Sequence, residues 1–345
     1  MKIAFVHDWL VYPGGAEKVF FDLIDDILNK KWYFSFPEIK AITSYEIFTT
    51  FYNPNFVLPE FVNKNKIKSV LSTTKIWSFY RNFFPLFPVF QKKLSAKIRS
   101  YNPDLVIISS FAIWKNIDFS GRKYLYLHSP MQYIWSHYED YLKKFSGVKK
   151  TIFKLSAKYL RTWDKKYNNF DYVIANSTYT KNLAKQIYNI NVEKVIFPKV
   201  NIPNFKKVDV VKKYNLNKDY FLYVWRLVRL VKNVDYLIKI FNKYPNKQLV
   251  LVGDWPDRNY LQSLAWENIK FLGYIPNTSD DYWNLILNSK AVINLTKESF
   301  WIVNYQVGKL WKTLISIDAW AINDIPWNKF LIKKFEDLEK YIEEL

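Results

Sequence analysis

The sequence predicts an α/β protein of two doubly wound domains, each a parallel sheet with helices on both faces. Short apolar runs alternate with helical patterns through both halves of the chain, as expected for parallel sheets. The 345 residues suit two domains of ordinary size. The tract 198–219 contains Pro198 and Pro203, has no clear period and is interpreted as a linker. We predict domains over 1–200 and 201–345, with a ligand cleft between them at the carboxyl ends of their strands.

The first domain begins with a buried strand, a loop and an amphipathic helix. Its short apolar runs predict strands over Lys2–His7, Asp104–Ser109, Lys123–His128 and Asp171–Asn176. Its helical patterns predict helices over Ala16–Asn29, Val148–Tyr167 and Thr178–Tyr188.

The second domain repeats this alternation. Its predicted strands are Tyr220–Trp225, Gln248–Gly253, Ile269–Leu272, Ala291–Leu295 and Thr313–Ile317. Its predicted helices are Asn233–Phe241, Asp257–Ala265, Ser279–Leu287 and Ile302–Leu310.

Composition excludes several classes of protein. Without cysteine the chain has no disulfides, thiolate nucleophiles or Cys-based zinc sites, which fits a cytoplasmic protein. No uncharged apolar run reaches the roughly 18 residues that a membrane span needs. The apolar start Ile3–Val6 is interrupted at once by His7 and Asp8, which argues against a signal peptide.

The net charge of +20 is concentrated in the first half of the chain. Residues 61–100 hold nine basic residues and no acidic one, and aromatic residues lie among the cations. Such a segment suits an anionic membrane surface, and we expect peripheral binding at the inner face of the membrane through 61–100. Nucleic acid, which we do not expect as a partner, and a merely exposed Lys- and Phe-rich surface are the alternatives.

Four sets of residues are candidates for chemistry. Gly14 and Gly15 lie between a strand and a helix, where bare N–H groups bind anions, although a tight turn also favours glycine. Arg226 and Lys232 follow a strand and are able to neutralise a diphosphate, although most such cations are solvated surface residues.

The other two candidates are Glu298 and His128. Glu298 precedes a helix and suits a sugar hydroxyl or a helix-capping role. His128 ends a predicted strand, from which it points toward the cleft or is satisfied by backbone at the core edge. The three histidines lack zinc-site spacing, so we expect no metal.

In combination these signals resemble the glycosyltransferase family 4 enzymes of GT-B fold, especially their bacterial mannosyltransferase-like branch. The resemblance covers roughly Met1 to Phe330. The matching strings are HDWLVYPGGAEKVF, LHSPMQYIW, DYVIANSTYTKNLA, RLVRLVKNVDYLI, LVGDWPDRNYLQSLA, NIKFLGYI and KESFWIV.

The resemblance implies a metal-independent, retaining hexosyltransferase that uses a sugar nucleotide, GDP-mannose being favoured, and no other cofactor. By resemblance, Arg226 and Lys232 grip the donor diphosphate, Glu298 is the first acid of a Glu-x7-Glu motif, and His128 faces the donor sugar. The remaining donor-binding positions are Gly14, Gly15, Trp225, Trp301, Ile302, Val303 and Gln306. The implied acceptor is a glycan or a lipid-linked intermediate.

Two departures from the family pattern concern the donor site. Gln306 stands where the second acid of Glu-x7-Glu is expected, which predicts weaker donor binding. The chain also has only seven glycines, against about 24 for average composition, and fourteen tryptophans. Tryptophan stands at several positions where the family has glycine, securely at Trp225, Trp255, Trp301 and Trp311, and less securely at Trp266, Trp320 and Trp327.

We interpret many of these tryptophans as mistranslated glycines. Some genetic codes read UGA as glycine and others as tryptophan, so decoding a gene by the wrong code converts only UGA-encoded glycines. Trp9, Trp135 and Trp163 match positions where the family itself has tryptophan. As written, indoles at 225 and 301 are expected to obstruct the donor.

Two other functions stay open at this stage. One is a sugar-nucleotide-processing GT-B enzyme such as an epimerase. The other is a catalytically silent GT-B protein that binds membrane or nucleic acid. Because family members often continue with helices that return to the first domain, we also expect that the C-terminus at Leu345 is truncated.

Overall fold

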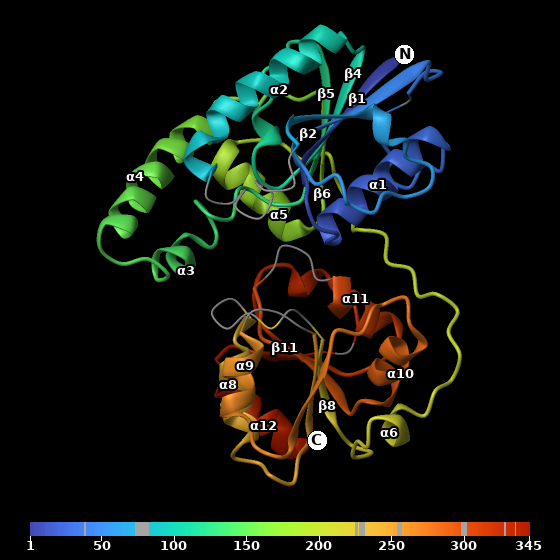
Figure 1. Cartoon of the computed structure of the whole chain (residues 1–345), viewed down its shortest axis with the longest axis vertical. Helices are drawn as coiled ribbons and strands as arrows, with labels where there is room; N and C mark the ends of the chain where they lie inside the picture. The colour runs from blue at the N-terminus through green and yellow to red at the C-terminus, as the bar shows by residue number, and fades with distance from the viewer. Residues whose placement is uncertain are drawn as a thin grey trace. The chain divides into compact units, whose positions relative to one another are not determined.

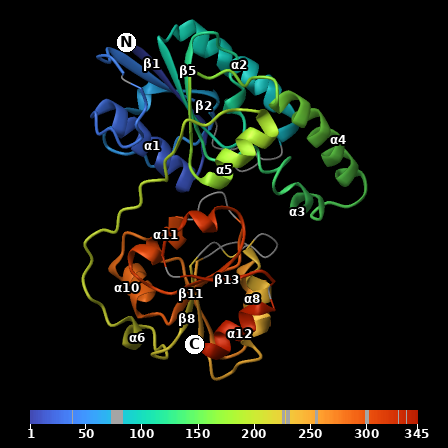
Figure 2. The same ribbon diagram turned by 180° about the vertical axis from the view of Figure 1, so that it is seen from behind.

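The computed structural model describes residues 1–37, 39–72, 83–224, 227, 232–253, 257–297, 302–327, 329–334 and 336–345, without the side chain of Trp320. The chain forms two compact units, Met1–Lys199 (unit 1) and Val200–Leu345 (unit 2). Each unit is a parallel sheet flanked by helices (Figures 1 and 2). Two Rossmann-like α/β units are the architecture of GT-B enzymes, as the sequence predicted.

Unit 1 contains a seven-stranded parallel sheet in the order β3-β2-β1-β4-β5-β6-β7 among its described residues. Its strands are β1 (Lys2–Leu10), β2 (Ser44–Tyr52), β3 (Ile67–Leu71), β4 (Leu105–Ser110), β5 (Arg122–Leu127), β6 (Tyr172–Ala175) and β7 (Lys194–Val195). Its helices are α1 (Gly15–Leu28), α2 (Phe87–Tyr101), α3 (Tyr138–Leu142), α4 (Gly147–Asp164) and α5 (Thr178–Leu183), which continues as a π-helical turn, η4 (Ala184–Tyr188).

Alternating side chains of the unit 1 strands bury both faces of the sheet, because successive residues of a strand point to opposite sides. On β1, Ile3 and Phe5 pack in the cluster that contains the apolar face of α1. Ala4 and Val6 pack in the cluster on the other face, together with α2 and α4. The strand is therefore mostly apolar, and His7 and Asp8, near its carboxyl end, are buried polar exceptions.

Unit 2 contains a six-stranded parallel sheet in the order β10-β9-β8-β11-β12-β13 among its described residues. Its strands are β8 (Phe221–Val224), β9 (Leu249–Val252), β10 (Ile269–Gly273), β11 (Ala291–Asn294), β12 (Leu314–Ile317) and β13 (Lys329–Ile332). Its helices are α6 (Val210–Lys213), α8 (Val234–Phe241), α9 (Arg258–Leu264), α10 (Asp280–Asn288), α11 (Ile302–Lys309) and α12 (Asp337–Glu344). None of the helices in the described residues is long and apolar enough to span a bilayer.

The segment 61–100 was expected from its charge and aromatic residues to bind a membrane. Residues 73–82 of it lie outside the described residues, the described parts contribute to the fold of unit 1, and the membrane contact stays a prediction. It supplies β3 and α2, and Phe87 and Phe90 of α2 are buried in the core. Phe83 and Phe84 pack against the same core. Neither element was predicted from the sequence, because the mixture of basic and aromatic residues suggested an exposed surface.

Trp311 occupies a backbone conformation that favours glycine. It follows α11 with φ of +57°, in the left-handed region, and its side chain is 83% exposed. The Trp311 N–H donates to the Gly308 carbonyl, and the Lys312 N–H donates to the Val307 carbonyl. This pair of bonds is a Schellman motif with Trp311 at the position where glycine is most common. Trp32, which is 54% exposed, also has a positive φ, +58°.

We expect Trp311→Gly to raise the free energy of unfolding by about 1 kcal/mol, because glycine has no Cβ to strain a left-handed residue. Trp311→Ala is the matched control, since it removes the indole but keeps the Cβ. Urea denaturation measures both variants. An alanine variant as stable as the glycine variant would contradict the argument from backbone conformation.

Candidate functional site

Unit 1 has a ligand-binding position dictated by its topology. The strand order runs outward in both directions from β1 and β4, which are paired in parallel, so the chain connections diverge at that point. Doubly wound sheets bind ligands in the crevice that such a divergence leaves at the carboxyl ends of the strands. His7 and Asp8, the Gly14–Gly15 turn, Ser109 and Ser110 all come from this edge.

Asp8 fixes the loop that follows β4. Its two carboxylate oxygens accept hydrogen bonds from four successive backbone N–H groups, those of residues 111–114, at 2.6–3.0 Å. The Ser110 hydroxyl also donates to the carboxylate. Full burial raises the pKa of Asp8 to about 6, whereas the four N–H groups act to lower it. Sequence reasoning missed this role, although a carboxylate in an otherwise apolar buried strand was the available signal.

Ser109 joins two buried histidines at the same edge. The His7 Nδ1 atom lies 3.0 Å from the Ser109 carbonyl, which only accepts, so this nitrogen carries the proton. The His128 Nε2 atom lies 2.8 Å from the Ser109 hydroxyl. Burial lowers the pKa of His128 to about 3, and burial together with the neighbouring His128 lowers the pKa of His7 well below its usual range. His128 is therefore a neutral hydrogen-bonding group at physiological pH, and its proposed contact with a donor sugar stays a prediction.

The glycine pair begins α1. Gly14 is the N-cap residue in an extended conformation, and no side chain caps the helix there. The Glu17 carboxylate folds back over this turn, and a Cβ on Gly14 would lie 2.5 Å from its Oε2 atom. Because Oε2 is the far end of a flexible side chain that can move aside, this contact alone does not require glycine at position 14. A carboxylate at the N-terminus of a helix is favoured by the helix dipole, so the turn has the chemistry of an anion site.

Unit 2 diverges in the same way between β8 and β11. These strands pair in parallel, with Phe221 beside Ala291 and Leu222 beside Val292. Trp225 and Arg226 follow β8 in the sequence, and Glu298 follows β11, but all three lie outside the described residues, as does Trp301. The strands that lead to these predicted site residues thus end at one edge of the sheet.

A hydrogen bond joins the segments that follow β8 and β11, near the point where the chain connections diverge. The Asn233 side chain, at the start of α8, donates from Nδ2 to the Leu295 carbonyl beyond β11 at 2.8 Å. Lys232, the predicted diphosphate ligand, immediately precedes Asn233 and is 93% buried. The hydrogen bond ties the segment that carries Lys232 to the loop that leads to Glu298.

Helix α11 carries the other described residues that were predicted to bind the sugar-nucleotide donor. Ile302 and Val303, in its first turn, are partly buried. Gln306 is buried, and its Oε1 atom accepts a 2.9 Å hydrogen bond from the Tyr282 hydroxyl of α10. The amide oxygen expected to serve the donor ribose is therefore engaged inside unit 2, and its role in donor binding stays a prediction.

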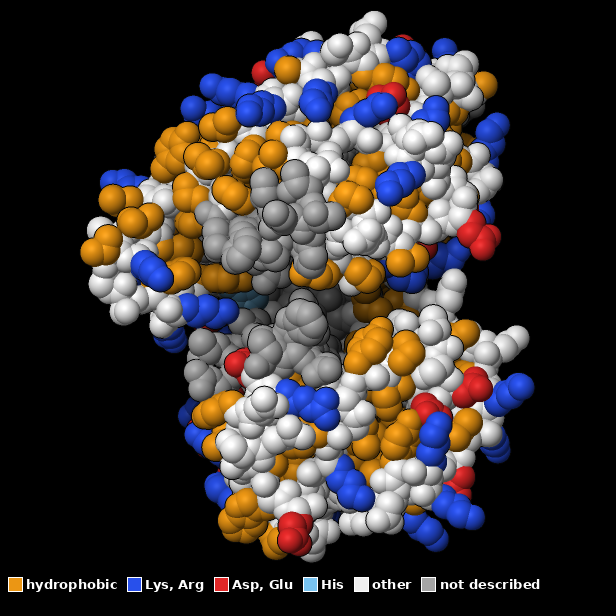
Figure 3. Space-filling view, in the orientation of Figure 1, with side chains coloured by type: hydrophobic (Ala, Val, Ile, Leu, Met, Phe, Trp, Pro, Cys, Tyr) orange, Lys and Arg blue, Asp and Glu red, His pale blue; other side chains and the backbone are white. Residues whose placement is uncertain are grey.

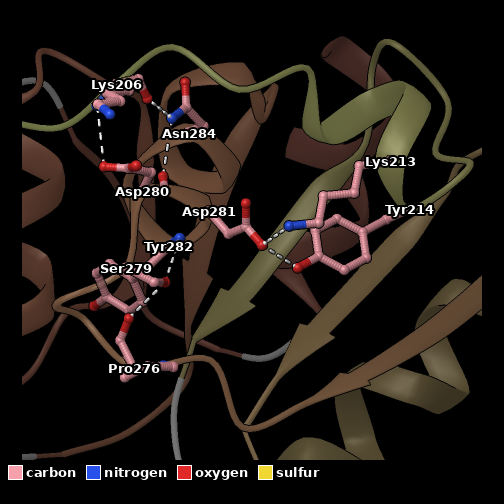
Figure 4. A network of polar contacts seen from close by, with 9 residues as sticks. All are labelled: Lys206, Lys213, Tyr214, Pro276, Ser279, Asp280, Asp281, Tyr282 and Asn284. Atoms are coloured by element: carbon pink, nitrogen blue, oxygen red, sulfur yellow. Dashed lines mark hydrogen bonds and ion pairs between the residues drawn. The ribbon is translucent and has the colours of Figure 1, made fainter.

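A polar network holds α10 in position (Figure 4). Asp281 accepts hydrogen bonds from Lys213 and from the Tyr214 hydroxyl, each at 2.5 Å. Asp280 and Asn284 bind the backbone N–H and carbonyl of Lys206 at 3.0 and 2.7 Å. These contacts attach α10, and with it Tyr282, to the segment that enters unit 2.

A second buried polar residue on α11 escaped sequence reasoning. Asn304 accepts a 2.9 Å hydrogen bond from Asn294 at the end of β11. Its own Nδ2 group is fully buried and has no hydrogen-bond partner in the part of the chain that the structure describes. Buried donors without a partner cost free energy, so this amide is a polar group in the first turn of α11 that the described residues leave unsatisfied.

The described tryptophans differ sharply in burial. Trp9 and Trp163, which the family resemblance treats as genuine, are buried, and Trp135 donates to Asp164 at 2.7 Å. Trp114 and Trp283, on which the resemblance gave little information, are also buried. Trp266 and Trp311, at positions where glycine was expected, are 60% and 83% exposed. Trp327, another position where glycine was expected, is partly buried against the unit 2 core and against Tyr305. Exposure therefore sets apart only Trp266 and Trp311 among the described suspected residues, and Trp32 is exposed in the same way.

No group of three or more potential metal ligands occurs among the described His, Asp and Glu residues. The described polar groups at the carboxyl-terminal edge of each sheet are hydrogen-bond donors and acceptors, and Lys232 is a described cation of the predicted site.

Residues 204–343 match the family described as glycosyl transferases group 1. This match covers most of unit 2 and less than half of the chain. No curated protein matches the chain in sequence.

Solved glycosyltransferases share the fold over the whole chain. HepE of Anabaena, solved in complex with UDP and glucose, superposes with a TM-score of 0.64 at 16% identity, over 100% of this chain and 89% of that protein. The sucrose-phosphate synthase of Thermosynechococcus elongatus superposes with a TM-score of 0.69 at 15% identity, with the same two coverages. WaaG, a glycosyltransferase involved in lipopolysaccharide biosynthesis, gives 0.64 at 12% identity over 99% and 90%. The shared fold and the family match over unit 2 both support a glycosyltransferase.

Proposed function

We propose that this glycosyltransferase transfers a hexose from a sugar nucleotide to a glycan or lipid-linked acceptor, with retention of anomeric configuration and without a metal. The observation that carries the proposal is the parallel pairing of β8 with β11, because the cations expected after β8 and the acid expected after β11 then follow adjacent strand ends. HepE has been solved with UDP-glucose, which supports a sugar-nucleotide donor. The sequence resemblance favours GDP-mannose, and hence mannose.

In the proposed reaction the cations stabilise the departing diphosphate. Arg226 and Lys232 neutralise charge that develops on the leaving nucleotide, and Glu298 and His128 orient the hexose. Because His128 is neutral, it contributes a hydrogen bond rather than a charge. The acceptor would meet the donor at the inner face of the membrane.

We further propose that glycine is the working residue at positions 225, 255, 301 and 311, and at position 32. The left-handed backbone at Trp32 and Trp311 and the exposure of both indoles support this. UGG codons at these positions in the source gene would contradict it.

A donor panel tests the proposed reaction. The chain with glycine at 225 and 301 is incubated with UDP-glucose or GDP-mannose carrying labelled hexose, and hydrolysis and transfer to a membrane-lipid extract are measured. We expect turnover of one donor, and a loss of about 100-fold in kcat with Lys232→Ala, because a cation at the leaving group acts mainly in the transition state. Lys239→Ala, an exposed lysine of α8, is the matched control and retains activity.

The products separate the alternatives. Labelled hexose joined to an acceptor supports the transferase. Conversion of the sugar nucleotide into another sugar nucleotide supports an epimerase, and the absence of any turnover by the glycine-bearing chain supports a silent binding protein.

A further inference from the structure

Helix α4 of unit 1 carries two apolar faces. Phe153, Ala157 and Leu160 point into the core and are buried. On the other side lie Val148, Ile152, Leu155 and Tyr159, which are 76%, 54%, 64% and 57% exposed. These four residues are spaced by four, three and four, so they form one continuous stripe along the helix. We call them the outer stripe.

The outer stripe is not a consequence of a loosely packed helix. The α4 residue Asp164 accepts hydrogen bonds from the side chains of Asn116, Trp135 and Tyr188 at 2.5–2.7 Å. Phe153 packs against Phe84, with ring centroids 5.5 Å apart. The inner face is thus held at its end and its middle, and the outer stripe faces solvent in a defined orientation.

Positive charge surrounds the outer stripe. Between Lys143 and Trp163 the chain has no acidic residue. The seven basic residues of this segment are Lys143, Lys144, Lys149, Lys150, Lys154, Lys158 and Arg161. At 3.6 residues per turn, Lys158 lies on one flank of the stripe and Lys149 on the other. Figure 3 shows hydrophobic and basic side chains gathered over α4 on this face of unit 1.

We propose that the outer face of α4 docks onto a bilayer that contains anionic lipid, with the outer stripe among the acyl chains and the lysines at the phosphates. An aliphatic row flanked by lysine is the pattern of a helix that lies in a membrane interface. The charge argues against a second copy of the chain on the same face, because two such faces would bring their flanking lysines together. Three of the four stripe residues are aliphatic, which disfavours nucleic acid, whose bases stack on aromatic side chains.

This site differs from the segment 61–100. Of the described large apolar residues in the α2 part of that segment, Leu86 and Val89 are each 47% exposed, whereas its phenylalanines pack inward. The inference does not depend on the proposed reaction, since binding to a bilayer needs neither donor nor acceptor.

Vesicle co-sedimentation of the full chain tests the proposal. Vesicles of phosphatidylcholine with phosphatidylglycerol are compared with phosphatidylcholine alone. We expect binding to the anionic vesicles that Ile152→Ser/Leu155→Ser weakens about ten-fold or more, since two large apolar side chains no longer enter the bilayer. Lys149→Gln/Lys158→Gln is expected to weaken it about ten-fold and to reduce its dependence on salt.

The controls change the same residue types elsewhere. Val57→Ser removes an apolar side chain that is 82% exposed, and Lys92→Gln/Lys93→Gln removes two exposed lysines from α2. We expect both to bind vesicles like the parent chain. Circular dichroism verifies that the α4 variants are folded, because all four altered side chains are exposed.

Three outcomes would overturn the proposal. The first is a parent chain that does not bind anionic vesicles. The second is binding lost with the α2 lysines but kept in the α4 variants, which would assign the membrane to 61–100. The third is a parent chain that binds a different partner in place of vesicles. Such a chain would either form a dimer in gel filtration that the serine variants dissociate, or bind an oligonucleotide that the glutamine variants no longer bind.

Discussion

Replacing Trp225 and Trp301 together by glycine is expected to raise affinity for a sugar nucleotide by about ten-fold or more. The reason is steric, because an indole fills space that a glycine leaves to the donor and its diphosphate. The two positions follow β8 and β11, whose carboxyl ends are adjacent at the divergence point of the unit 2 sheet. Isothermal titration calorimetry with UDP-glucose and GDP-mannose measures the change.

Trp266→Gly/Trp311→Gly is the matched control for this experiment. Both residues are exposed, and they precede β10 and β12, so they lie at the amino-terminal edge of the same sheet, away from the proposed donor. We expect no change in donor affinity with the control pair. Equal affinities for the parent chain and for the 225/301 variant would contradict the steric argument.

The second large effect is on stability, where Asp8→Asn is expected to lower the free energy of unfolding of unit 1 by about 3 kcal/mol or more. Each carboxylate oxygen accepts two of the four N–H groups of residues 111–114. An amide keeps one such oxygen and turns an NH₂ group toward the other two donors. Two buried N–H groups then have no acceptor. Denaturation in guanidinium chloride measures the loss.

The pH dependence of this loss has a definite sign. Burial raises the pKa of Asp8 to about 6 in the folded chain, from 3.8 for the ordinary group. The folded state therefore holds its proton more tightly, so the contribution of Asp8 to stability is full below pH 3.8 and declines as the pH rises to about 6. The difference between parent and Asp8→Asn should widen as the pH falls from 6 to 4.

Asp118→Asn is the control for Asp8. Its side chain is 54% exposed and pairs with Arg99 at 3.0 Å, a type of contact worth about 1 kcal/mol or less. A loss of similar size for both variants, or a pH-independent difference for Asp8→Asn, would contradict the account.

The sequence predicted elements well where apolar runs are short and bounded. The strand expected over Ala291–Leu295 is β11 at Ala291–Asn294, and the helix expected over Ile302–Leu310 is α11 at Ile302–Lys309. Prediction failed for β2, where Ser44–Tyr52 mixes threonine and aromatic residues without a clear boundary. It also failed for α2, whose lysines suggested a surface segment although its phenylalanines are buried.

The candidate site was predicted unevenly. Residue type and position after a strand made Gly14, His128 and Lys232 candidates, the family resemblance gave them roles in donor binding, and those roles stay predictions. Residue type and position did not indicate Asp8 or Ser109. The hydrogen-bond partners of these two residues lie about 100 residues away in the sequence or beside the neighbouring strand. Such contacts exist only once the strands are paired.

The sequence alone determined the alternation of strand and helix, the division into two α/β units and the surplus of tryptophan over glycine, because each is a property of local pattern or composition. The tertiary structure decided which polar groups meet at the divergence points, that Trp32 and Trp311 have left-handed backbones, and that the outer face of α4 is left uncovered. These depend on strand order, backbone torsion and burial, and none of the three is fixed by the residues within one segment.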